Sequence, residues 1–93
     1  MIAARFRALG DPTRLRIVLE LIDGTRCVCE LREAVGVAGP LLSHHLAVLR
    51  QAGLVAASRR GRWVDYSVTP EARTMVACSD DRLAGAVPQA AVR

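Results

Sequence analysis

The fold of this chain is decided by residues 27–53, which read CVCELREAVGVAGPLLSHHLAVLRQAG. The first part of this stretch has apolar residues at helical spacing. Val28, Leu31 and Val35 fall on one side of a helix that is expected to run from about Cys27 to Val35. These three residues are therefore expected to face the core.

A second helix follows a short turn over residues 36–39. Pro40 suits the first position of a helix, and Gly53 is a stop signal after Ala52. The inner face of this helix is defined by Leu42, Leu46, Leu49 and Gly53. Two helices of this size joined by a turn of four residues predict a helix-turn-helix.

Two more helices are expected before this motif. The apolar residues of the first are Ile2, Phe6 and Leu9, and it ends near Gly10. Asp11 offers an N-cap for a second helix over residues 12–23, and Thr25 is the expected cap of the helix at Cys27. The apolar stripe of the second helix is Leu15, Val18, Leu19 and Ile22, with Arg14, Arg16, Glu20 and Asp23 on the opposite side.

A β-hairpin is expected after the helix-turn-helix. Leu54–Arg60 and Trp63–Val68 are the strands, and Gly61-Arg62 fits a two-residue turn between them. The inward face of the second strand is expected to be Val64, Tyr66 and Val68. An arginine-tipped hairpin in this place is a wing. The predicted fold class is therefore mainly α with a small β-hairpin, a winged helix-turn-helix.

A last helix is expected to follow the wing. Thr69 caps it over Pro70–Cys78, with a continuation to Ala86 left open. The whole is expected to be one domain over residues 1–87. The Ala-rich residues 88–93 are expected to be a frayed tail.

Composition narrows the class of protein. Hydrophobic residues make up 52% of the chain and charged residues 24%, unlike a disordered tail. No apolar run approaches the ~18 residues of a membrane span, and no h-region of a signal peptide is seen. Three cysteines, an odd number, argue against a disulfide framework, so reduced thiols in the cytoplasm are expected. A domain this small is expected to need a metal or a partner chain.

Positive charge is concentrated in the middle of the sequence. The formal net charge is +4, and all 13 basic residues are arginines. Residues 34–64 contain Arg50, Arg59, Arg60 and Arg62 and no acid, so the whole excess lies there. Such a surface is expected to face a polyanion, most often nucleic acid.

The outer side of the helix over residues 40–52 is the surface that a recognition helix offers to the major groove. Opposite the core lie Pro40, His44, Ala47 and Gln51, flanked by Leu41 and Ser43. His44 and Gln51 can reach base edges or phosphates, and Ser43 can bond a phosphate. His45 turns toward the core and is expected to be a hydrogen-bonded structural histidine.

The wing tip adds Arg59, Arg60 and Arg62, which are expected to contact phosphate or the minor groove. The sequence leaves open which of the three reaches DNA. Arg50 could equally form an ion pair on the helix surface. The predicted DNA-binding residues are Pro40, Leu41, Ser43, His44, Ala47, Arg50, Gln51, Arg59, Arg60 and Arg62.

Three segments carry a resemblance to a known family: FRALGDPTRLRI at residues 6–17, SHHLAVLRQAGLV at 43–55 and GRWVDY at 61–66. They resemble the opening, the recognition helix and the wing of ArsR/SmtB-type repressors, over about residues 5–72. The resemblance implies a homodimeric winged-helix repressor that leaves its operator when an inducer, usually a metal ion, binds. Two positions depart from the family pattern. Many members have a basic or polar residue in place of Leu41 and an arginine in place of His44, which implies more reliance on the wing.

Two cysteines open the helix that precedes the turn. Because Val28 takes the inward position, Cys29 is expected to face solvent, which is unusual for a structural cysteine. A helix start and Arg26 favour a thiolate there, and thiolates select soft ions such as As(III), Cd(II), Hg(II) or Cu(I). On an ideal helix Cys27 and Cys29 lie about 200° apart, so both can hold one ion only if the first turn unwinds. Unwinding would shift the recognition helix.

The run Cys-Val-Cys-Glu-Leu at residues 27–31 resembles the arsenic- and antimony-sensing branch of the family. There a third cysteine follows three positions after the second, where this chain has Arg32. Cys78 is the only other thiol and could complete the site, so the predicted ligands are Cys27, Cys29 and Cys78. The ligands of the cadmium/lead branch and of the zinc/nickel/cobalt branch are not matched.

The expected function is therefore a repressor that binds double-stranded operator DNA, an imperfect inverted repeat, and releases it on binding arsenite or antimonite. One alternative is a response to redox, or to a divalent metal such as Ni, Zn or Cd at another site. A different class is a winged-helix module for protein interaction or dimerisation without metal sensing. No carboxylate pair, nucleophile–base constellation or phosphate loop is present, so neither an enzyme nor a catalytic cofactor is expected.

Overall fold

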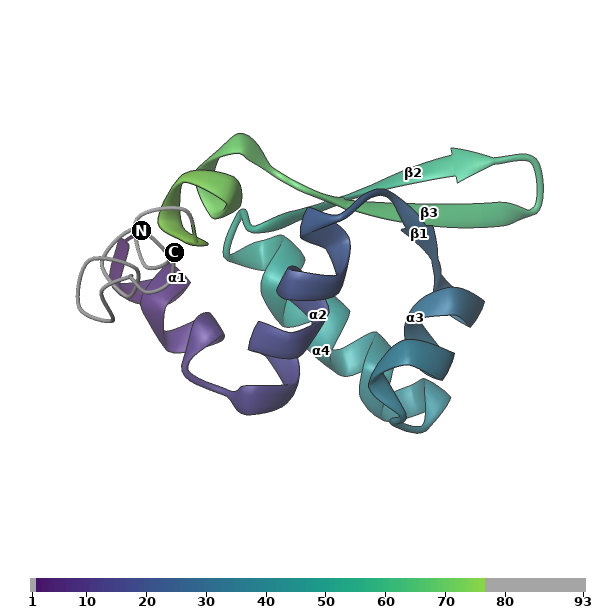
Figure 1. The fold of residues 1–93 in the computed structure, drawn as a ribbon, viewed down its shortest axis with the longest axis horizontal. Coiled ribbons are helices and arrows are strands. Elements are labelled where there is room, and N and C mark those ends of the chain that lie inside the picture. Colours follow the sequence, from purple (N-terminus) through teal and green to yellow (C-terminus); the bar gives the residue numbers. More distant parts are fainter. Residues whose placement is uncertain (1, 77–93) are drawn as a thin grey trace, which may run out of the picture.

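The computed structural model of the chain describes residues 2–76. The elements are α1 Ile2–Leu9, α2 Pro12–Ile22, β1 Arg26–Cys27, α3 Val28–Val35, α4 Gly39–Gln51, β2 Val55–Arg60 and β3 Trp63–Val68 (Figure 1). Residues 70–76 are also helical. The mainly α fold with a hairpin is confirmed. Four expectations fall outside the described residues: Cys78 as a ligand, the last helix beyond residue 76, the domain end at 87 and the tail at 88–93.

α2 begins where its capping residues predict. The Asp11 carboxylate accepts a hydrogen bond from the backbone N–H of Arg14 at 3.0 Å, and Pro12 stands in the first turn. The same hydrogen bond holds the pKa of Asp11 below its ordinary value. The cap therefore fixes the start of α2 directly after α1.

The inward face of α2 differs from the prediction. Ile17, Val18 and Leu21 are buried, whereas Leu15 and Leu19 of the predicted stripe are 38% and 42% exposed. Apolar residues occupy two sides of this helix, so the sequence allowed two choices of inner face. Arg14 was expected on the outer side. It shares the inner face and reaches the other helices through its guanidinium, as described below.

The helix-turn-helix forms as predicted. Gly36 ends α3 with a φ of +77°, a left-handed conformation that glycine adopts without strain. α4 begins at Gly39, one residue earlier than expected. Its inner residues Leu42, Leu46 and Leu49 are buried. In α3, Leu31 is buried, and Val28 and Val35 pack against the core.

The wing is a two-stranded ribbon extended by a short third strand. The sheet order is β1-β3-β2, with all pairs antiparallel. Arg60 pairs with Trp63, which leaves the predicted two-residue turn, and Gly61 has a φ of +63°. β1 was not predicted, because two residues carry no readable pattern. It joins Cys27 to Asp65 of β3.

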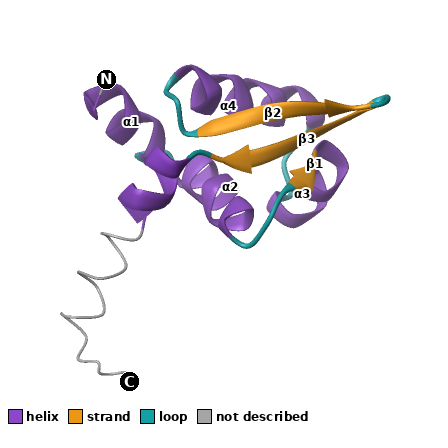
Figure 2. Cartoon of the chain, turned by 90° about the horizontal axis from the view of Figure 1, so that it is seen from above, coloured by secondary structure: helices purple, strands orange, loops and turns teal. Residues whose placement is uncertain are grey.

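The ribbon projects beyond the helices (Figures 1 and 2). This explains why its predicted inward face is only partly formed. Tyr66 and Val68, near the body, pack against the core, whereas Val64, nearer the tip, is not among the residues that do so. The outer part of the wing therefore depends on strand pairing rather than on burial.

The segment after the wing returns to the body. The Thr69 hydroxyl donates to the Gly53 carbonyl at 2.7 Å and accepts from the Ala72 N–H at 3.2 Å, so Thr69 caps the helical residues 70–76 as predicted. The core consists of Ala8, Ile17, Val18, Leu21, Leu31, Leu42, Leu46, Leu49, Leu54, Val55, Ala72 and Val76. Within the described part, no helix is long and apolar enough to cross a membrane.

Candidate nucleic-acid interface and thiol site

The outer side of α4 is accessible along its length. Six of the seven predicted residues on this helix are exposed: Pro40, Leu41, Ser43, His44, Arg50 and Gln51. Ala47 is half-buried. The leucines of the opposite side pack α4 against the hydrophobic core. The imidazole of His44 and the carboxamide of Gln51 are therefore carried on a fixed helix. Such a helix can enter a groove without reorganising.

His45 occupies the opposite side of α4 and is held by an arginine. It is the only buried polar residue among those described, with 8% of its surface exposed. The Nη1 of Arg14 lies 3.3 Å from the His45 Nδ1. Since a guanidinium can only donate, Nδ1 is the acceptor and the neutral ring carries its proton on Nε2. The prediction of a hydrogen-bonded structural histidine is confirmed.

The same arginine connects α4 to the N-terminal helix. The Nε of Arg14 donates to the Ala8 carbonyl, near the end of α1, at 2.8 Å. Arg5 of α1 donates its Nε–H to the Ala52 carbonyl, the C-cap of α4, at 3.4 Å. α1 and α2 therefore fix α4 at its middle and at its end. Neither contact was predicted, and the charge of an arginine on an amphipathic helix gave no signal that it points inward.

The three arginines of the wing are all exposed, but they are not equivalent. Arg60 donates two hydrogen bonds to Asp65, from Nε at 2.8 Å and from Nη2 at 3.3 Å. This pair lowers the pKa of Asp65 and raises that of Arg60. Arg59 donates from Nε to the Gly61 carbonyl at 3.3 Å. Among residues 2–76, no residue forms a hydrogen bond or an ion pair with the side chain of Arg62.

The thiols lie at the junction of β1 and α3. Cys27 is half-buried and Cys29 is exposed, and both are free cysteines. The helix was predicted to include Cys27, and this was wrong. Cys27 is the N-cap of α3, with an extended backbone at φ −83° and ψ 168°. Thr25 is therefore not the cap. The ideal-helix angle between the two thiols does not apply either, because only Cys29 has helical geometry.

Glu30 completes this cap. Its carboxylate accepts a hydrogen bond from the backbone N–H of Cys27 at 2.9 Å. The same bond is the main reason why the pKa of Glu30 lies below its ordinary value. A shallow hollow beside the cap is lined by Cys29, Glu30, Arg32 and Glu33. Among residues 2–76 no group of three or more His, Cys, Asp or Glu side chains is placed to hold a metal ion.

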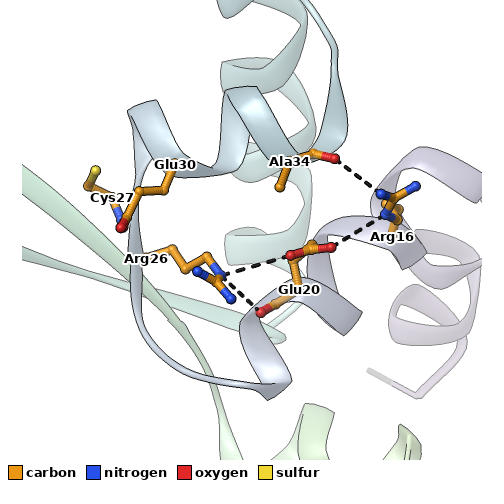
Figure 3. Close-up of polar contacts among 6 residues, drawn as sticks. All are labelled: Arg16, Glu20, Arg26, Cys27, Glu30 and Ala34. Carbon is orange, nitrogen blue, oxygen red and sulfur yellow. Dashed lines mark hydrogen bonds and ion pairs between the residues drawn. The ribbon is translucent and has the colours of Figure 1, made fainter.

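A chain of polar contacts ties α2 to this junction (Figure 3). Arg26 donates to the Glu20 carbonyl at 3.3 Å and lies 3.9 Å from its carboxylate. Arg16 pairs with the same carboxylate at 3.6 Å and donates to the Ala34 carbonyl in α3 at 3.1 Å. Figure 3 shows the Cys27 sulfur pointing away from these polar contacts. The backbone at the thiols is therefore anchored, and Cys27 forms no disulfide within the described part of the chain.

Comparisons with known proteins place these features in a family. A model described as "Bacterial regulatory protein, arsR family" matches residues 11–57. The arsenical resistance operon repressor of Escherichia coli K12 is 46% identical over 66 residues, covering 70% of this chain and 56% of that protein. The transcriptional repressor SmtB of Mycobacterium tuberculosis H37Rv is 50% identical over 60 residues, covering 64% and 44%.

A solved structure shares the fold as well. It is the homodimeric winged helix-turn-helix DNA-binding domain Mb0332 of Mycobacterium bovis, described as a possible ArsR-family regulator. It superposes with a TM-score of 0.86 at 26% identity, covering 95% of this chain and 82% of that chain. The chain spans about half the length of the curated relatives it matches.

Proposed function

Because the chain belongs to the ArsR family of bacterial regulatory proteins, we propose that it is a DNA-binding transcriptional repressor in the cytoplasm, not an enzyme. The observation that carries the proposal is the exposed outer side of α4, followed by the arginine-tipped turn of the wing. Residues 34–64, which include both, contain no acid. α4 would lie in the major groove, with Ser43, His44 and Gln51 nearest the bases and phosphates.

The wing would supply sequence-independent affinity. Guanidinium groups near phosphates displace counterions, so binding weakens steeply as salt rises. Arg62, without a competing acid in the described structure, is the first candidate for such a contact. Leu41 offers no hydrogen bond to DNA, and this leaves more of the affinity to the wing.

The repressor is proposed to act as a homodimer on an imperfect inverted repeat. Ile2 and Phe6 of α1 are 65% and 63% exposed, which is costly for a small domain without a partner. They border a hollow whose lining is Ile2, Arg5, Phe6, Glu71, Thr74 and Met75. We propose that a second copy sits there; to bind two half-sites, its recognition helix must lie about one helical turn, roughly 34 Å, from the first.

The proposed inducer is a thiophilic ion, with As(III) first, held by Cys27, Cys29 and Cys78. The exposed Cys29 and the half-buried Cys27 are soft donors, which match arsenite better than hard ions. A trigonal site needs a third sulfur, for which Cys78 is the remaining thiol. The names of several relatives refer to arsenic resistance, which supports this choice of ion.

Ion binding is proposed to act through the cap of α3. In this proposal the ion draws on Cys27, whose backbone both caps α3 and pairs with β3. Because α3 leads directly into the turn before α4, loss of this cap would tilt the recognition helix. A redox change at the same thiols, or a divalent metal at another site, is the competing explanation.

Operator release under reducing conditions tests the inducer. The protein is bound to DNA from upstream of its own gene, and arsenite, Cd(II), Ni(II) or Zn(II) is added in turn. We expect arsenite to release the wild type but not Cys27→Ser or Cys29→Ser, and Cys78→Ser tests the third ligand. Release by Ni(II) or Zn(II) that is independent of these cysteines would contradict the thiol site.

A further inference from the structure

Trp63 is an exposed aromatic residue beside the arginines of the wing. It begins β3 directly after the turn, and half of its surface, 50%, is exposed. It belongs neither to the buried core nor to the residues packed against it. A single exposed apolar side chain is common on proteins and by itself indicates nothing. The surroundings of this one are more informative.

The strand register places Trp63 next to positive charge. Directly paired residues on antiparallel strands share a face, so Trp63 lies on the same face as its partner Arg60. Arg62 precedes it in the turn. Residues 58–63 read Ser-Arg-Arg-Gly-Arg-Trp and contain no acid. The indole therefore sits at a tip suited to a polyanion rather than to an apolar protein surface.

Asp65 is the partner of the Arg60 guanidinium on the Trp63 face of the wing. It occupies the same face two residues beyond Trp63, and it holds the Arg60 guanidinium through two hydrogen bonds at 2.8 and 3.3 Å. The Arg60 side chain is thereby drawn along the strand toward the body, away from the tip. Trp63 and Arg62 are left to meet a partner.

We propose that Trp63 is a DNA-contact residue of the wing, with its indole packed against the sugar–phosphate wall of the minor groove beside Arg62. This inference rests on the proposed function. An indole suits this wall chemically, because its apolar face can cover deoxyribose while its N–H can donate to a phosphate oxygen. The contact reads no base and so adds affinity for any duplex.

The chain contains a single tryptophan, so its fluorescence reports on this position alone. The full chain is excited at the red edge, where Tyr66 does not absorb, and quenched with acrylamide. The sample is measured free, with a duplex from upstream of its gene, and with a mixed-sequence duplex at low salt. We expect acrylamide quenching of Trp63 to fall severalfold with both duplexes and to recover when high salt dissociates them.

Two variants complete the test. Trp63→Ala should weaken binding to both duplexes by about tenfold, as for other aromatic residues buried at interfaces. Trp63→Phe, which keeps an aromatic face but loses the indole N–H, should recover part of this loss. Circular dichroism should show that both variants keep the wild-type thermal unfolding.

Three outcomes would overturn the proposal. A duplex that binds in a mobility-shift assay without changing the quenching of Trp63 rejects the contact and leaves the repressor function standing. Quenching that falls with protein concentration alone assigns the indole to a second copy of the chain. Absence of binding to any duplex rejects both the contact and the proposed function.

Discussion

α4 and the wing are both proposed to meet DNA, but they are held in place by different forces. The inner side of α4 carries three buried leucines and a buried His45 fixed by Arg14. The outer part of the wing has strand pairing and one exposed ion pair, Arg60–Asp65. Packing therefore sets the position of α4, whereas backbone pairing and charge set the wing. Substitutions in the two regions should fail in different ways.

The largest expected difference concerns stability. Leu49 is fully buried in α4. Leu49→Ala should lower the free energy of unfolding by about 2–5 kcal/mol, because a cavity remains. That is a large share of the stability of a small domain. Arg62→Ala in the wing is the matched control and should change stability by less than about 0.5 kcal/mol. Urea denaturation measures the stability of both variants. Equal shifts of the unfolding midpoint would contradict the claim that packing holds α4 but not the wing.

Arg14→Ala tests the polar part of the α4 attachment. It leaves the Ala8 carbonyl and the His45 Nδ1 without their donor, at an expected cost of about 1–3 kcal/mol. Arg14→Lys should recover only part of this cost, because one ammonium cannot span both acceptors. Nitrogen NMR of the imidazole should find Nδ1 unprotonated in the wild type and a mixture of tautomers in Arg14→Ala. An unchanged tautomer would show that Arg14 does not orient the ring.

The wing arginines should differ in their contribution to salt dependence. If Arg62 contacts a phosphate, Arg62→Ala should reduce the slope of log affinity against log salt by about 1. Arg60→Ala should reduce it less, since Arg60 is engaged by Asp65. Filter binding over a salt series measures both slopes. A larger effect of Arg60→Ala would mean that DNA displaces Asp65 from the pair.

The smallest effect is expected from the ion pair itself. The Arg60 guanidinium lowers the pKa of Asp65 below its ordinary 3.8 in the folded protein. The pair's contribution to stability is therefore fully present above that ordinary value and is lost as the pH falls through the lower, folded-state value. Thermal unfolding of wild type and Asp65→Asn should differ slightly at neutral pH and converge in strong acid. A gap that widens with acidification would contradict the assigned sign.

Most of the fold was predictable from the prolines and glycines that begin and end its helices and turns. Pro12, Pro40, Gly36 and Gly53 bound the helices, and Gly61 forces the turn of the wing. The inner face of α2 was not predictable, because its apolar residues cover two sides of the helix. The buried side includes Arg14, whose partners lie on α1 and α4, outside the sequence pattern of α2.

The candidate site was predictable to a similar degree. A helical wheel was enough to place His44 and Gln51 outside and His45 inside. The Arg60–Asp65 pair could have been found as well, since a two-residue turn makes these positions diagonal neighbours. The place of Cys27 could not, because it depends on β1, whose two residues pair with a strand about forty positions later.

The central claim is that α4 reads sequence while the wing supplies general affinity. The most direct test compares wild type, His44→Ala and Arg62→Ala on the upstream duplex and on a scrambled duplex of the same length and composition. We predict that His44→Ala reduces the ratio of the two affinities, whereas Arg62→Ala lowers both affinities and leaves the ratio unchanged. A ratio lost with Arg62→Ala but kept with His44→Ala would contradict this division of roles.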